Sequence, residues 1–155
     1  MSLKQLAELE YQVRYQDKPD FPENARFKRR YSDRTANGLT KAIIDWIRLN
    51  AGFAERVNVQ GRPIDRTRIA TNTLGQRQRI GSIDWIPAGG TRGSSDIHAT
   101  VAGRSYYIEV KIGRDKLSQA QKEYRDQVTQ AGAVYFVAKD FDSFIEFYNE
   151  QIGQT

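Results

Sequence analysis

The sequence predicts an α/β fold in which a mixed β-sheet is flanked by helices. An apolar run with alternating charges, residues 106–112, follows a glycine turn and predicts the second strand of a hairpin. An amphipathic stretch over residues 118–130 predicts a helix, and the apolar run 133–138 predicts a buried strand. A strand, helix and strand that follow a hairpin place parallel and antiparallel pairs in one sheet, so the expected core order is αβββαβ.

Two helices are expected before the sheet. Residues 2–14 carry apolar residues at helical spacing, and prolines then open a polar connector. Residues 37–50 form an amphipathic pattern ended by a glycine, with Asp45 and Arg48 expected to face outwards. We therefore divide the chain into 1–36, an N-terminal helix and basic connector, and 37–155, the main domain.

The remaining elements follow from the same patterns. We expect a strand to start at 57–59, an arginine-rich loop to follow, and β structure to resume at 80–86. Residues 96–101 are the expected first strand of the hairpin, with its turn at 103–105. A last helix, capped by Asp142 and Ser143, is expected to run through 151.

The hairpin carries the residues that point to chemistry. Side chains alternate between the two faces of a strand, so Glu109 and Lys111 share one face while Ile108 and Val110 pack into the core. Asp96 begins the partner strand, so its carboxylate and that of Glu109 can meet. Magnesium takes hard oxygen ligands, often one or two carboxylates with waters and phosphate oxygens.

Two interpretations of Asp96, Glu109 and Lys111 are possible, one functional and one in which they are ordinary surface residues. Asp96, Glu109 and the carbonyl of Val110 would supply ligands for a divalent cation, and Lys111 could orient or deprotonate a water and stabilise charge on a phosphate. Against this, Glu-x-Lys on a strand is common and usually marks a solvated sheet surface.

The order of motifs favours the functional interpretation. Gly93-Ser94-Ser95-Asp96, then Glu109-Val110-Lys111, then Leu117-Ser118-x-x-Gln121 resemble the PD-(D/E)XK nuclease superfamily, and are most similar to its VRR-NUC family. The resemblance covers residues 37–138. It implies a restriction-endonuclease-like fold, Mg²⁺ or Mn²⁺ bound by Asp96 and Glu109, a catalytic Lys111 and a supporting Gln121.

The sequence departs from this family in two places. The family has Gly-x-Pro-Asp before its metal-binding aspartate, whereas Ser94 and Ser95 stand there in this chain. Family members also carry a glutamate on the first core helix, for which Asn37 or Thr40 is the nearest polar substitute here. We expect a weaker or water-bridged second metal position.

Two other residues have alternative interpretations. Ser118 and Gln121 also fit a capping box, so Gln121 can cap a helix, support the site, or do both. His98, the only histidine, lies two residues after Asp96 and could contact a phosphate or water. A lone histidine is more often a structural residue with its hydrogen bonds satisfied.

Charge favours a polyanionic partner. The chain has a formal net charge of +5 and a pI near 9.5. Two basic clusters are candidate nucleic-acid contacts, with solvated surface or a packed linker as their alternatives. The first comprises Arg62, Arg66, Arg68, Arg77, Arg79 and Arg92, and the second comprises Lys28, Arg29 and Arg30.

We therefore expect a divalent-metal-dependent DNA endonuclease, and the resemblance implies that it acts as a homodimer on branched DNA in the manner of a Holliday-junction resolvase. The alternatives are a flap or single-strand nuclease of phage replication or repair, and a catalytically inactive nucleic-acid-binding module. A basic protein-interaction domain would leave the motif residues unexplained. The absence of cysteine and of long apolar runs predicts a cytoplasmic protein without a membrane segment, and the resemblance implies a bacterial or phage origin.

Overall fold

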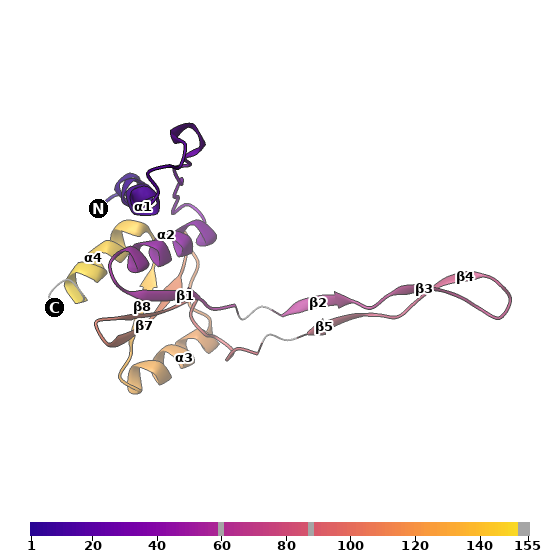
Figure 1. The fold of residues 1–155 in the computed structure, drawn as a ribbon. Coiled ribbons are helices and arrows are strands. Elements are labelled where there is room, and N and C mark those ends of the chain that lie inside the picture. The colour runs from indigo at the N-terminus through magenta and orange to yellow at the C-terminus, as the bar shows by residue number, and fades with distance from the viewer. Residues whose placement is uncertain (59–60, 87–88, 152–155) are drawn as a thin grey trace. The chain divides into compact units, whose positions relative to one another are not determined.

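The structure is a computed structural model that describes residues 1–58, 61–86 and 89–151 (Figure 1). Its contacts divide the chain into two compact units. Unit 1 combines Met1–Val57 with Arg92–Thr155, and unit 2 is Asn58–Thr91. The two units are described separately below.

Unit 1 is a mixed α/β structure built on a four-stranded sheet with the strand order β1-β6-β7-β8. The first three strands are antiparallel neighbours, and β7 and β8 run parallel, so the expectation of a mixed sheet flanked by helices is confirmed. The strands are β1 (Phe53–Arg56), β6 (Ile97–Val101), β7 (Arg104–Val110) and β8 (Val134–Ala138). The helices are α1 (Leu3–Gln16), η1 (Glu23–Ala25), α2 (Ala36–Leu49), α3 (Gln119–Gln130) and α4 (Phe141–Gln151).

Helices cover both faces of this sheet. Figure 1 shows α2 and α4 on one face and α3 on the other, with α1 lying against α2. The main core fills the layer between the sheet and α2 and α4, where Ile43, Ile108 and Phe144 are fully enclosed. Leu6 of α1 is buried in this same core, which anchors the N-terminal helix to unit 1.

Strand β7 follows the expected alternation of side chains, but its charged face is more buried than the sequence suggested. Ile108 and Val110 enter the main core as expected from alternation. Glu109 and Lys111 lie on the other face, but both are buried as well. That face is covered by α3 and its preceding loop, so it is an enclosed polar layer and not a solvated sheet surface.

Helix boundaries agree closely with the sequence patterns, with one correction at the C-terminal helix. Thr35 caps α2, where its hydroxyl accepts a 3.2 Å hydrogen bond from the amide of Gly38. Helix α4 begins one residue earlier than the expected cap. The amide of Ser143 donates to the side chain of Asp140 at 2.7 Å, so Asp140 caps this helix and Asp142 lies in its first turn.

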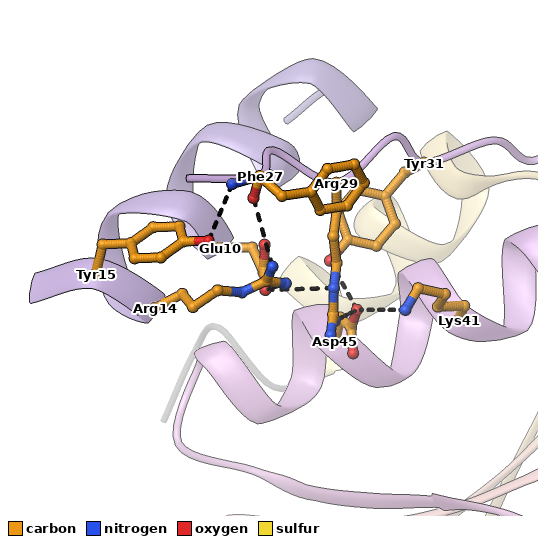
Figure 2. Close-up of polar contacts among 8 residues, drawn as sticks. All are labelled: Glu10, Arg14, Tyr15, Phe27, Arg29, Tyr31, Lys41 and Asp45. Carbon is orange, nitrogen blue, oxygen red and sulfur yellow. Dashed lines mark hydrogen bonds and ion pairs between the residues drawn. The ribbon is translucent and has the colours of Figure 1, made fainter. Parts of the chain in front are cut away.

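Asp45 does not face outwards as the helical pattern of α2 suggested. Its side chain is 15% exposed, and Arg29, Tyr31 and Lys41 surround it (Figure 2). The hydroxyl of Tyr31 donates to Asp45 Oδ2 at 2.7 Å, and Arg29 Nη1 lies 2.8 Å from the same oxygen. The amphipathic pattern could not show this, because Arg29 and Tyr31 come from the connector that precedes the helix.

The connector is tied to α1 by a second set of polar contacts. Figure 2 shows the backbone of Phe27 clamped between Tyr15 and Arg14: its amide donates to the Tyr15 hydroxyl at 3.0 Å, and its carbonyl accepts from Arg14. Glu10 lies beneath, paired with Arg14 and with Arg29. Together with the Asp45 contacts, these bonds favour the interpretation of the second basic cluster as a packed linker.

Unit 2 is a single long two-stranded ribbon, and the expectation of an arginine-rich loop is wrong. Strand β2 (Arg62–Asp65) pairs with β5 (Ile83–Ile86), and β3 (Arg68–Thr71) pairs with β4 (Arg77–Ile80), all antiparallel. The expected strand at 57–59 is also absent in its described part, because β1 already ends at residue 56; Val59 lies outside the described residues.

The register of the ribbon does not slip along its length. Arg62 faces Ile86 at one end and Thr71 faces Arg77 at the other, with the same offset in both pairs of strands. The amide of Arg66 donates to the carbonyl of Ser82 at 3.0 Å and keeps that offset between them. Residues 62–86 therefore form one hairpin, called the ribbon below, in which residues 66–67 and 81–82 separate the two paired segments.

Candidate active site

Asp96 lies immediately before β6, at the end of the loop of residues 92–95 that packs against α3. Its carboxylate accepts a hydrogen bond from the amide of Val110 at 2.8 Å, which fixes the side chain against the end of β7. Its own carbonyl accepts from the amide of Val57 at 2.9 Å. The hairpin therefore brings Asp96 beside the Glu109–Val110 segment, as its sequence position suggested.

The loop that delivers Asp96 depends on a glycine. Gly93 has φ +83°, and a Cβ there would lie 2.3 Å from the carbonyl oxygen of Ala120 in α3. Ser95 is fully buried and its hydroxyl donates to the carbonyl of Ile97 at 3.2 Å. Close packing onto α3 thus holds the loop without the proline found in the resembling family.

Glu109 is the most enclosed charged group of the site, at 2% exposure. Burial raises its pKa to about 7, and the negative charge of Asp96 acts in the same direction, against the opposing effect of Lys111. Its Oε1 contacts both Lys111 and Gln121, whereas its buried Oε2 has no hydrogen-bond partner among the described residues. An unsatisfied buried carboxylate oxygen is costly unless a cation or proton meets it.

Lys111 is held between two carboxylates. Its ammonium nitrogen lies 3.0 Å from Glu109 Oε1 and 3.4 Å from Asp115 Oδ2. Burial acts to lower the pKa of Lys111, but Glu109 and Asp115 outweigh it and raise that pKa above its ordinary value. The lysine is therefore a fixed positive charge at neutral pH, and Asp115 is a neighbour that the turn pattern at residues 113–116 did not predict.

Gln121 makes both contacts that the sequence left open. Its Oε1 accepts from the amide of Ser118 at 2.9 Å, and the Ser118 hydroxyl accepts from the amide of Gln121, which completes a capping box at the start of α3. Its Nε2 donates to Glu109 Oε1. One amide side chain therefore fixes the helix start and orients the glutamate.

The carbonyl of Val110 faces the same edge as Asp96. In a strand, the N–H and C=O of one residue point to the same neighbour, and the N–H of Val110 points to Asp96. The next amide, of Lys111, donates instead to the carbonyl of Ala138 in β8. This alternation directs a main-chain oxygen towards the side of β7 on which Asp96 lies.

His98 belongs to a cluster of aromatic residues under α3. Its ring lies 4.5 Å from that of Tyr107 and its Nε2 is 3.2 Å from the hydroxyl of Tyr124. Burial lowers the pKa of His98 below its ordinary value, so the ring is neutral at neutral pH. These contacts favour the structural interpretation of the histidine.

Tyr135 is a site neighbour that the sequence did not reveal. Its hydroxyl is buried without a hydrogen-bond partner among the described residues, and burial, with the charges of Glu109 and Asp96, raises its pKa. Strand β8 pairs Tyr135 with Tyr107 and so aims it at the polar layer. Only the parallel register of β7 and β8 could have shown this, and the sequence does not specify a register between strands so far apart.

The two polar substitutes on α2 are used elsewhere. Asn37 accepts a 2.7 Å hydrogen bond from Arg56, and Thr40 is buried in the helix face. Among the described residues, no group of three or more His, Cys, Asp or Glu side chains forms a metal centre. The site thus offers two carboxylates and a carbonyl, a set that fits a cation which keeps several waters and phosphate oxygens, as Mg²⁺ does.

The candidate nucleic-acid contacts divide between the two units. Lys28 pairs with Glu8, and Arg29 is committed to Glu10 and Asp45. Arg30 and Arg92 are exposed in unit 1. The other five arginines, Arg62, Arg66, Arg68, Arg77 and Arg79, lie on the ribbon.

Comparison with known proteins adds no relative to this picture. No model of a protein family matches the sequence, and a search among curated proteins finds no match. The resemblance to PD-(D/E)XK nucleases therefore rests on the sequence motifs at residues 93–96, 109–111 and 117–121. In the described part of the chain, no helix is both long and apolar enough to cross a bilayer.

Proposed function

We propose that this chain is a divalent-metal-dependent DNA endonuclease with a restriction-endonuclease-like core of the PD-(D/E)XK type. The observation that carries the proposal is the unpartnered, buried Oε2 of Glu109 in the field of Asp96. The element order α2-β1-β6-β7-α3-β8 supports the core assignment. A buried carboxylate oxygen without a partner calls for an explanation, and here, unlike at the equally unpartnered Oε2 of Glu10, a second carboxylate and a main-chain carbonyl lie beside it.

Asp96, Glu109 and the Val110 carbonyl are the groups that would hold Mg²⁺ or Mn²⁺. The bound cation would supply a Lewis acid that polarises the phosphoryl group. Lys111 contributes a fixed ammonium that can donate hydrogen bonds to the attacking water and to a phosphate oxygen. Because its pKa is raised, it acts by orienting groups and stabilising charge, and not as a base.

Gln121 and Asp115 position these groups. The Gln121 amide holds Glu109 Oε1, which leaves Oε2 of the same carboxylate for a cation. Asp115 keeps Lys111 charged and restrains its ammonium. The arrangement orders the reacting groups before substrate binds, which is the main contribution that a protein makes to phosphodiester hydrolysis at a metal site.

Substitution of the site separates binding from chemistry. Asp96→Asn, Glu109→Gln and Lys111→Ala are each expected to abolish cleavage in Mg²⁺ or Mn²⁺ while the protein stays folded and still binds DNA in Ca²⁺. Asp142→Asn is the matched control, because Asp142 is exposed in the first turn of α4 and touches none of these groups. Cleavage by Asp96→Asn at the wild-type level would refute the metal assignment.

The same experiment also tests the alternative of a catalytically inactive DNA-binding module. That alternative predicts that the wild-type chain binds DNA in Ca²⁺ but cuts nothing when Mg²⁺ or Mn²⁺ is added. For the substrate, we propose branched DNA cut by a homodimer, since one chain carries one such site. Light scattering and a competition between four-way junctions, flaps and linear duplex test this, and a monomer that cuts flaps equally well would replace the resolvase assignment by the flap nuclease.

A further inference from the structure

The ribbon has no core of its own. None of the described residues of 58–91 is buried. A two-stranded hairpin alone is marginally stable in water at best. Its side chains are therefore available to a partner, and their chemistry identifies that partner.

The charge of the ribbon is strongly one-sided. Between 58 and 91 there are five arginines, two aspartates, and no lysine or glutamate. Asp84 pairs with Arg66 at 3.1 Å and Asp65 with Arg79 at 3.2 Å, so both acids are already engaged. Within the described residues, Arg62, Arg68 and Arg77 make no ion pair, and their guanidinium groups remain for a polyanion.

Arginines project from both faces of the ribbon. Residues opposite each other in an antiparallel pair share a face, and faces alternate along each strand. Arg62 and Arg68 therefore lie on one face, and Arg77 lies on the other. The second face also carries Ile69 and Trp85, which are 65% and 66% exposed.

The tip of the ribbon is ordered by its own side chains. The Asn72 side chain accepts hydrogen bonds from the amides of Leu74 at 3.0 Å and Gln76 at 2.9 Å. Gly75 takes the φ of +78° that closes the turn. These contacts order the turn before a partner binds, which lowers the entropy that the turn loses on binding.

We propose that the ribbon is a DNA-binding element that lies lengthwise in the major groove of B-form duplex. This inference rests on the proposed function only in taking DNA as the substrate. The major groove, about 12 Å wide, admits a two-stranded ribbon. At about 3.4 Å per residue, the eleven positions from Arg62 to Asn72 span about 35 Å, close to one helical turn of DNA.

Both faces of the ribbon suit this groove. Phosphate backbones wall the groove on two sides, and because Arg62 and Arg68 lie on one strand of the ribbon and Arg77 on the other, these arginines can reach both DNA strands. Arginine can also read guanine edges, and Ile69 offers the apolar surface that thymine methyl groups accept. A second copy of the chain fits less well, because two ribbons of this composition repel each other.

The test measures DNA binding in EDTA, where no cleavage occurs. A labelled duplex is titrated over a range of salt with the wild type and with the triple variant Arg62→Gln, Arg68→Gln, Arg77→Gln. Each lost phosphate contact lowers the slope of log K against log salt by about 0.9, so the triple variant should lower it by up to about 2.7 and weaken binding at least about tenfold.

The matched control removes the same charge from unit 1. Lys4, Lys18 and Lys139 are exposed, and their triple replacement by glutamine should change the slope far less. Equal effects of the two triple variants, or none from the arginines, would overturn the proposal. Because these side chains are exposed, both variants are expected to fold, which circular dichroism checks.

A second variant and a second substrate sharpen the assignment. Replacing residues 66–82 by Asn-Gly joins Asp65 to Ile83 through a two-residue turn and should weaken duplex binding at least as much. An RNA duplex of the same sequence should bind much more weakly, because its deep, narrow major groove excludes the ribbon. Equal binding of DNA and RNA duplexes would refute the groove assignment.

Two outcomes separate this inference from its competitors. If the ribbon instead binds a second copy, the shortened chain becomes monomeric by light scattering while its DNA salt slope stays that of the wild type. If the chain never cleaves DNA but its binding depends on the ribbon arginines, the nuclease proposal fails and the ribbon inference stands. If the chain cleaves DNA but its binding does not depend on the ribbon arginines, the ribbon inference fails and the nuclease proposal stands.

Discussion

Glu109 makes the stability of the metal-free protein depend on pH. Its pKa is raised from 4.5 to about 7 in the folded chain. Between these values the folded chain holds a proton that the unfolded chain has released, so the free energy of unfolding falls as pH rises. At about 1.4 kcal/mol for each unit, the full loss is about 3 kcal/mol above pH 7.

Glu109→Gln isolates this effect. Glutamine is neutral at every pH and nearly the same size, so contributions from other titrating groups cancel when the two proteins are compared. Urea unfolding in EDTA at about pH 4 and about pH 8 should show that the wild type loses about 3 kcal/mol more than the variant. Equal losses would mean that the buried carboxylate is already compensated, and would refute the reasoning from its unpartnered oxygen.

Divalent cation should reverse the loss. A cation that binds only the folded, ionised site stabilises it by about 2.7 kcal/mol at a concentration of about a hundred times its Kd. Mg²⁺ or Mn²⁺ at about pH 8 should therefore restore the wild type and leave Glu109→Gln nearly unchanged. Equal stabilisation of both proteins would place the cation elsewhere.

Three further predictions concern the supports of the site and of the connector. Gly93→Ala should lower the free energy of unfolding by about 2 kcal/mol, because φ is positive at this residue and an added Cβ would meet the α3 backbone. Gly103→Ala is the control, because Gly103 also has a positive φ but lies in open space, and it should lower the free energy of unfolding by about 1 kcal/mol. Urea unfolding of the two variants measures this difference. Asp45→Ala removes the shared partner of three connector and helix side chains and should speed proteolysis of the connector, followed by gel, while Asp20→Ala in the same segment should not. Gln121→Glu keeps the capping oxygen but sets a carboxylate against Glu109, so the midpoint of the pH–rate profile of the proposed cleavage should move upwards, and an unmoved midpoint would restrict Gln121 to its capping role.

Alternation and capping signals were enough to predict most of unit 1. The paired positions of Glu109 and Lys111, the hairpin from Asp96, and the capping box at Ser118 all follow from local patterns, and the structure has each of them. These patterns extend over only a few residues, so they can be recognised in the sequence without information on tertiary contacts.

Contacts between distant segments could not be predicted in this way. The burial of Glu109 comes from α3 and its loop, and Tyr135 reaches the site only through the parallel register of β8. Strand β5 of the ribbon lies within the expected β structure at 80–86, whereas β2, β3 and most of β4 were missed because their arginines and polar residues leave no continuous apolar face, which is the signal that identifies a half-buried strand. Asp45 was misjudged for a related reason, since two of its partners, Arg29 and Tyr31, lie in an irregular segment before its helix.

The unbroken register of the ribbon also has a consequence for its length. Deleting one residue from each strand would shorten it by about 3.4 Å and exchange the two faces of everything towards the tip. Deleting two from each strand would shorten it by about 7 Å and leave every arginine on its original face. The offset between the two strands is the same on both sides of residues 66–67 and 81–82, so the length of the ribbon can change in steps of two residue pairs. Its reach can therefore change by small deletions or insertions in pairs, without redesign of the strands that remain.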